Sequence, residues 1–107
     1  MAYKVLGQSA PASTTNADLY TVPAGKSAVV STLAIANVTG TAATARAFVR
    51  VAGTAASVSN ALVYDVSVGA NATIALTLGI TLNATDVVTI QSGTSSALTF
   101  HAFGSEN

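Results

Sequence analysis

The stretch Leu19–Asn37, LYTVPAGKSAVVSTLAIAN, decides the fold class of this chain. Two apolar runs rich in β-branched residues meet at the segment PAGK, residues 23–26, which no helix could continue. Proline presets φ for the first corner of a turn, and Ala24 at the second corner disfavours a type II turn. We therefore expect a type I turn closed by a glycine bulge at Gly25. The stretch predicts a β-hairpin whose second arm, Ser27–Asn37, is the longest strand.

The second arm of this hairpin is apolar on both faces. Alternation puts Val29, Leu33 and Ile35 on one face. The opposite face carries the smaller apolar residues Ala28, Val30, Ala34 and Ala36. Strands that are covered on both faces read as nearly continuous apolar runs. We therefore expect this strand in a sandwich whose outer face is also covered.

The rest of the chain carries short segments of alternating polarity separated by turn residues. The further strands that we expect are 3–8, 43–52, 61–68, 72–78, 87–92 and 97–103. Turns are expected at 69–71 and 83–86, loops at 9–17 and 53–60, and a bulge at Gly79. The last two strands are expected to form a hairpin around Gly93.

These segments predict an all-β fold: a single antiparallel β-sandwich of about eight strands in one domain, residues 1–107. We favour a jelly roll over an immunoglobulin-like sandwich, because eight strands fit it and the chain has neither tryptophan nor cysteine. The residues expected between the sheets are Leu33, Ile35, Ile74, Leu76 and Ile90.

In three of the expected strands, strict alternation predicts which face of the strand each side chain occupies. In 43–52, Ala45, Ala47, Val49 and Val51 are expected inward, and Thr44, Arg46, Phe48 and Arg50 outward. In 61–68, Leu62, Tyr64, Val66 and Val68 are expected inward, and Val63, Asp65 and Ser67 outward. In 72–78, Ile74, Leu76 and Leu78 share one side, and Thr77 lies on the exposed one.

The charge content is unusually low. The 107 residues include four Lys or Arg and four Asp or Glu, so the net charge is zero. Nucleic-acid binding needs clustered cations, so we expect no nucleic-acid partner and no membrane partner. No apolar run is long enough for a membrane helix, and the start of the chain does not read as a signal peptide. Because a monomer is normally kept soluble by charge, we expect the chain to associate with itself.

No residue pattern indicates a reaction. The chain has no cysteine, and its one histidine, His101, lacks the second imidazole or converging carboxylates of a metal site. No serine lies in a nucleophile-elbow sequence, and Asp86 is explained as a turn residue. We therefore expect no catalytic residue, no metal site, no cofactor and no enzyme activity.

The one concentrated feature lies in the strand 43–52. Arg46 and Arg50 flank Phe48 on one strand face. Arginine and aromatic side chains are enriched in the hot spots of protein interfaces, so these three residues are the candidate interface site. The alternative is a solvated face on which the arginine stems shield the ring.

Two segments resemble small virion proteins of tailed bacteriophages. One is LYTVPAGKSAVVSTLAIANVTGTAATARAFVRVAG, residues 19–53, with its YTVPAG turn and alternating R-x-F-V-R strand. The other is LGITLNATDVVTIQSGT, residues 78–94, with its TDVVT strand. The resemblance covers about residues 18–103 and rests on turn and strand signatures. It implies a structural protein of the phage particle and offers no catalytic residues to carry over.

The resemblance leads to a concrete expectation of function. The chain would be a non-enzymatic virion protein, a capsid decoration or cement protein that stabilises the shell as a homo-oligomer, for example a trimer. Its partners would be further copies of itself and the major capsid protein, and it would join the virion in the cytoplasm of the bacterial host. Two alternatives remain open: a tail component, such as a fibre, tube or baseplate subunit, and a host-glycan-binding module.

Overall fold

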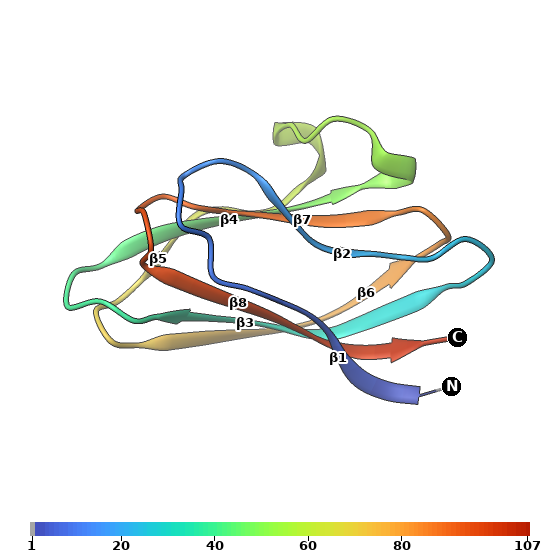
Figure 1. The fold of residues 1–107 in the computed structure, drawn as a ribbon, viewed down its shortest axis with the longest axis horizontal. Helices are drawn as coiled ribbons and strands as arrows, with labels where there is room; N and C mark the ends of the chain where they lie inside the picture. The colour runs from blue at the N-terminus through green and yellow to red at the C-terminus, as the bar shows by residue number, and fades with distance from the viewer. Residues whose placement is uncertain (1) are drawn as a thin grey trace.

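The structure, a computed structural model that describes residues 2–107, consists of two antiparallel four-stranded sheets packed face to face (Figure 1). The side chains of Ala2 and Leu78 lie outside the described part. The strands are β1 (Ala2–Ser9), β2 (Ala17–Thr21), β3 (Ala28–Asn37), β4 (Ala43–Arg50), β5 (Ala61–Val68), β6 (Thr73–Leu82), β7 (Val87–Ser92) and β8 (Leu98–Glu106). Between β4 and β5 lie two short 3-10 turns, η1 (Val51–Gly53) and η2 (Val58–Asn60). The predicted all-β sandwich is confirmed.

The strand order joins distant parts of the chain. One sheet has the order β1-β8-β3-β6 and the other β2-β7-β4-β5, so only the β4–β5 connection stays within one sheet. The first and last strands are neighbours, with Ala2 opposite Glu106, and both termini lie at one end of the sandwich (Figure 1). We expect of a jelly roll eight strands whose connections mostly cross between two sheets. We therefore keep the jelly roll as our interpretation of this sandwich.

The two expected hairpins are wrong. A turn does form at residues 23–26, where the Lys26 amide donates to the Pro23 carbonyl over 3.2 Å. Gly25 stands at the third position of this turn with φ of 78°, as in a type II turn, and not in a type I turn with a bulge. The turn carries the chain from β2 in one sheet to β3 in the other. The same happens between β7 and β8. Turn residues mark a reversal of the chain, but they do not say in which sheet the next strand pairs.

A β-bulge reverses the expected faces in the first part of β3. The register passes from Val30 opposite Gly104 to Thr32 opposite Phe103, which leaves Ser31 unpaired. One extra residue shifts the alternation by one. The residues that face the other sheet are therefore Ala28, Val30, Leu33, Ile35 and Asn37, all buried. The expectation that Val29 shares a face with Leu33 is wrong for this reason.

Gly79 lies at the irregularity expected for it. The pairing of β6 with β3 passes from Ile80 to Thr77, and Gly79 has φ of 66°, a conformation that favours glycine. The expected exposure of Thr77 is confirmed.

The core lies between the sheets. Leu33, Ile35 and Ile90 are fully buried there, as expected, and are packed with Phe100 and Leu98. Ile74 and Leu76 point the same way but are only partly buried, because β6 is an edge strand. The described residues contain no helix long and apolar enough to cross a membrane.

The turn at residues 83–86 closes one end of the sandwich against the β2–β3 connection. Its Asp86 amide donates to the Asn83 carbonyl over 3.1 Å, as the turn prediction requires. Val22 forms two backbone hydrogen bonds with this turn: the Val22 amide donates to the Asp86 carbonyl, and the Thr85 amide donates to the Val22 carbonyl. The Asp86 carboxylate is buried and accepts from the amides of Asn83 and Ala52, each at 2.9 Å. One carboxylate therefore holds both this turn and the start of the β4–β5 connection.

Candidate functional site

The three candidate residues lie together on the outer face of the β2-β7-β4-β5 sheet. Ala43, Ala45 and Ala47 of β4 are buried in the core. Alternation therefore turns Arg46, Phe48 and Arg50 outward, as the sequence predicts. In the register of the sheet, Gln91 of β7 and Tyr64 of β5 lie on either side of Arg46, while Thr89 and Ala61 flank Phe48.

Phe48 is not the exposed anchor that we expected. Only 4% of it is accessible, although it stands outside the core between the sheets. The β4–β5 connection folds back over this face (Figure 1), so that Ala56 and Val58 line the same hollow as Phe48. The sequence showed residues 53–60 only as an unpatterned loop, and so it gave no sign that they cover the ring.

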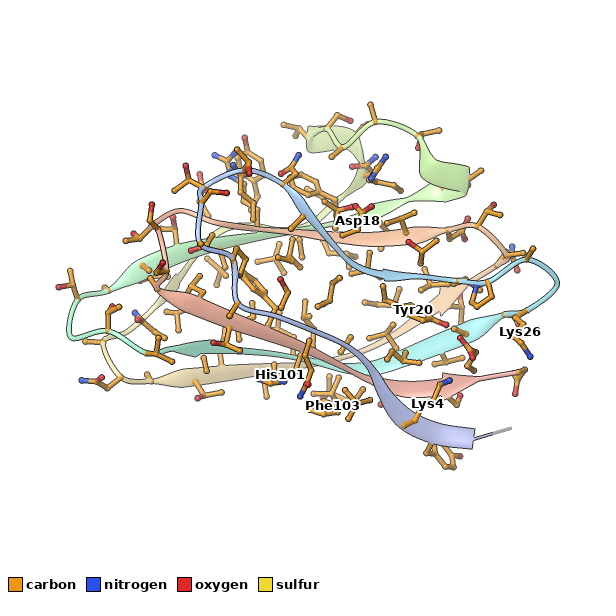
Figure 2. The ribbon with its side chains drawn as sticks, in the orientation of Figure 1. Lys4, Asp18, Tyr20, Lys26, His101 and Phe103 are labelled. Atoms are coloured by element: carbon orange, nitrogen blue, oxygen red, sulfur yellow. The ribbon has the colours of Figure 1, made fainter. Side chains whose placement is uncertain are left out.

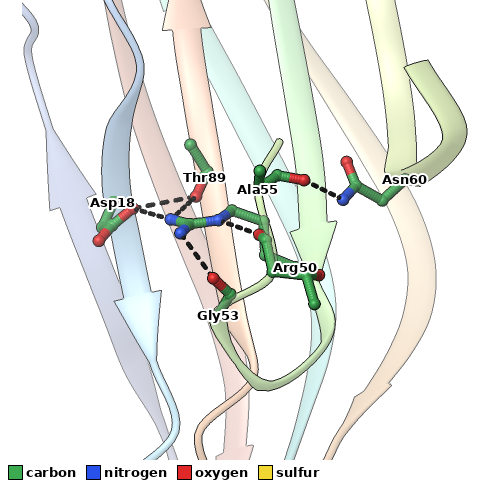
Figure 3. Close-up of polar contacts among 7 residues, drawn as sticks. Asp18, Arg50, Gly53, Ala55, Asn60 and Thr89 are labelled. Carbon is green, nitrogen blue, oxygen red and sulfur yellow. Dashed lines mark hydrogen bonds and ion pairs between the residues drawn. The ribbon is translucent and has the colours of Figure 1, made fainter. Parts of the chain in front are cut away.

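Arg50 fastens this connection to the sheet (Figure 3). Its Nε donates to the Thr54 carbonyl over 2.7 Å, and its Nη2 donates to the Gly53 carbonyl over 3.0 Å. Its Nη1 reaches Asp18 Oδ1 on β2 at 3.1 Å and Thr89 Oγ1 on β7 at 3.3 Å. A guanidinium presents several donors in a fixed planar arrangement, which suits it to this task. The contacts give Arg50 a structural role under the loop.

Arg46 is the candidate residue that remains accessible at the surface. Its Nε and Nη2 donate to the two carboxylate oxygens of Asp65 at 2.7 and 3.1 Å, a bidentate pair. The hydrogen bond from Arg46 lowers the pKa of the Asp65 carboxyl, and the same bond raises the pKa of Arg46. The guanidinium carbon also lies 4.0 Å from the centre of the Tyr64 ring, a cation–π contact. Arg46, Tyr64 and Asp65 form one ordered group, which we call the Arg46 cluster.

The sequence placed Tyr64 on the wrong face. Asp65 is the bulged residue of β5: Val66 pairs with Ala45, the next pair is Tyr64 with Arg46, and Asp65 has φ of 59°. Val66 and Val68 face inward as predicted, but beyond the bulge Leu62 and Tyr64 are exposed and Val63 packs on the core. Aspartate is depleted in strands and tolerates positive φ better than most residues, so Asp65 was the available signal of a bulge.

The Arg46 cluster separates two shallow hollows. One, of about 440 Å³, is lined by Phe48, Tyr64 and Val58 together with the loop residues Thr14, Thr15 and Asn16. The other, of about 450 Å³, is lined by Asp65, Gln91 and Gly93, the last of these in the β7–β8 connection. Tyr64 is 49% exposed beside them. A cation, an aromatic ring and side-chain amides on a fixed sheet are suited to recognition of a partner.

His101 lies on the other sheet, away from the Arg46 cluster. Its Nδ1 is 3.2 Å from Gln8 Nε2, and its ring stacks on that of Phe103 with the centroids 6.0 Å apart. Among the described residues, no three His, Cys, Asp or Glu side chains gather as a metal site.

No family model, no curated protein and no solved structure matches this chain.

Proposed function

We propose that this chain is a non-enzymatic structural protein of a tailed-phage particle, and that it decorates the capsid as a homo-oligomer. A protein that binds the assembled shell, and not its separated subunits, stabilises the shell by mass action. Many copies, each with modest contacts, would then raise the temperature at which the shell ruptures.

The observation that carries this proposal is the contact between the two phage-like segments. The VPAG segment begins with Val22, and the TDVVT strand begins in the 83–86 turn, about sixty positions further along the chain. Two backbone hydrogen bonds, of 3.0 and 2.9 Å, join Val22 to Asp86 and Thr85. Segments that form a single joint in the fold support the resemblance better than two unconnected motifs would.

We place the docking surface at the Arg46 cluster, in place of the Phe48 anchor that the sequence suggested. The bidentate pair with Asp65 uses the Nε and Nη2 sides of the Arg46 guanidinium, and Nη1 takes no part in it. That side would donate to a carboxylate or a backbone carbonyl of the major capsid subunit, while the Tyr64 ring supplies the apolar contact. The cluster is ordered before binding, so little conformational entropy is lost on docking.

The proposal is tested on particles produced from the genome that encodes this chain. Electron microscopy of purified particles that carry a labelled chain should show it on the capsid. Tyr64→Ala should weaken binding to bare capsids by roughly thirtyfold, the loss typical of an aromatic hot spot. Val38→Ala removes an exposed apolar side chain from a turn outside the cluster, and it should bind normally.

Three results would overturn parts of this proposal. A chain found only on tails would replace decoration by the tail alternative. Its absence from purified particles would contradict a virion role altogether. Equal binding of Tyr64→Ala and wild type to capsids would exclude the Arg46 cluster as the docking surface.

One observation favours the glycan-binding alternative. Tyr64 is half exposed and lines one hollow together with Asn16 and Gln91, so an aromatic ring and two amide-bearing residues border the same space. Sugar rings could stack on such a tyrosine while the amides bind hydroxyl groups. A glycan array gives the decision: hits that disappear in Tyr64→Ala would support this alternative, and an array without hits would contradict it.

A further inference from the structure

Among the residues that the structure describes, the outer face of the β1-β8-β3-β6 sheet carries no charged side chain. The register assigns three residues to this face from β1, four from β8, four from β3 and four from β6. They are Tyr3, Val5, Gln8, Thr99, His101, Phe103, Ser105, Val29, Thr32, Ala34, Ala36, Thr73, Ala75, Thr77 and Thr81. We call these residues the neutral face. A solvated sheet face in an antiparallel sandwich is ordinarily polar, with charges interspersed.

All eight charged residues of the chain lie elsewhere. Lys4 and Glu106 share the inner side of the same sheet, where they pair at 2.9 Å, and Glu106 also accepts from the Tyr20 hydroxyl of the other sheet. The remaining charges belong to the other sheet or to turns: Asp18, Lys26, Arg46, Arg50, Asp65 and Asp86. Of the two broad outer surfaces of the sandwich, only that of the β2-β7-β4-β5 sheet therefore carries charged side chains among the described residues.

The neutral face is divided into a raised half and a low half. β1 and β8 carry the large side chains, among them Tyr3, which is 85% exposed, and the stacked rings of His101 and Phe103 (Figure 2). On this face, β3 and β6 carry mostly alanine and threonine. The rows across the sheet show the contrast directly: His101 is followed by Ala34 and Ala75, and Phe103 by Thr32 and Thr77.

We propose that the neutral face binds the same face of a second copy, with a two-fold axis parallel to the strands. That axis places β8 of one copy over β3 of the other, and β1 over β6. Phe103 then lies opposite Thr32 of the second copy, and His101 opposite Ala34, so that raised positions meet low ones. The sheets would pack nearly aligned, as sandwich layers do.

A second copy is the occupant that the charge and the area favour. An uncharged surface gains nothing from a charged partner, whose ions would lose their hydration without compensation. The copy offers an uncharged surface of the same extent. Strands of eight to ten residues at about 3.3 Å per residue, in four rows about 4.8 Å apart, cover roughly 500 Å². Two such faces bury about 1,000 Å², at the lower bound of specific interfaces, so we expect micromolar association.

This inference identifies the surface of the homo-oligomer that the proposed function invokes, but its test needs no particle. Sedimentation of the full chain at about 100 μM, well above a micromolar dissociation constant, should show a dimer. Thr32→Glu buries an unpaired carboxylate at the contact and should weaken association at least about a hundredfold. Phe103→Lys should do the same. The matched control is Ser67→Glu, an exposed strand residue on the other sheet, which should still dimerise.

The two-fold arrangement is tested by mixing the two variants. Thr32→Glu and Phe103→Lys place opposite charges on different copies. At about 10 μM, where each variant alone should be mostly monomeric, an equimolar mixture should therefore recover the dimer. Circular dichroism melts must show that each variant is folded. A wild-type monomer at about 100 μM, or a Thr32→Glu dimer as tight as wild type, would overturn the proposal. A mixture that stays monomeric would exclude this two-fold arrangement. A dimer that nevertheless fails to bind capsids would leave the interface intact and contradict only the proposed function.

Discussion

Phe48→Ala should destabilise the domain without changing which residues form its core. The ring is 4% exposed and is enclosed by the sheet below and the β4–β5 connection above. Truncation of a buried phenylalanine costs about 3–5 kcal/mol. We expect about 3 kcal/mol here, because the covering side is a surface connection that can settle into the space. For a domain of about 100 residues this corresponds to a fall in melting temperature of roughly 12–24 °C.

The assay is a pair of urea and thermal melts followed by circular dichroism, with Tyr64→Ala as the control. Tyr64 lies on the same face but is half exposed, so its truncation should cost about 1 kcal/mol or less. The two aromatic residues thus separate a structural role from an accessible one. A loss below about 1 kcal/mol for Phe48→Ala would mean that the connection does not seat on the ring, and the reasoning for this face would fail.

Three further changes test other parts of the structure. Leu33→Ala, in the core, should cost about 2–5 kcal/mol in urea melts, whereas Thr77→Ala should stay within about 0.5 kcal/mol; equal losses would contradict the assigned faces. Arg50→Lys keeps the charge but cannot bind Gly53, Thr54 and Asp18 together, so hydrogen exchange of residues 51–60 should accelerate while the core remains protected. Unchanged exchange would contradict the role of Arg50 in holding the β4–β5 connection on the sheet. The hydrogen bonds from Tyr20 and then Lys4 lower the pKa of Glu106 below its usual 4.5, so the stability that this group contributes is present above pH 4.5 and lost as the pH falls through the lowered pKa. A Glu106→Gln variant should therefore lose less stability than the wild type over this acid range. Identical pH profiles of stability for the two proteins would exclude that contribution.

Alternation and turn residues predicted where the strands are, because both are local properties of the chain. The segment 87–92 was predicted with the bounds that β7 has, and 61–68 with those of β5. Leu33 and Ile90 were placed in the core for the same reason. Strand pairing is not local, so both expected hairpins proved to be crossings between sheets.

The candidate site was predicted in part. Alternation put Arg46, Phe48 and Arg50 on one face, but it could not show that a loop without a pattern would cover Phe48 and occupy Arg50. Tyr64 was missed because a single extra residue, Asp65, reverses the alternation of its strand. The same error affected Val29 in β3, where Ser31 is the extra residue. A bulge depends on how two strands pair, so the sequence of one strand alone seldom predicts it.

The order of the β1-β8-β3-β6 sheet has a consequence for how the chain folds during synthesis. Both neighbours of β3, the strands β6 and β8, are translated after it, and β1 has to wait for β8 at the opposite end of the chain. Folding of this sheet therefore cannot be completed until β8 has left the ribosome. Chains dominated by such distant pairings fold in milliseconds to seconds. Until then β3, which is uncharged over its ten residues, presents two unpaired edges, and a slower rate of translation would prolong that exposure to aggregation.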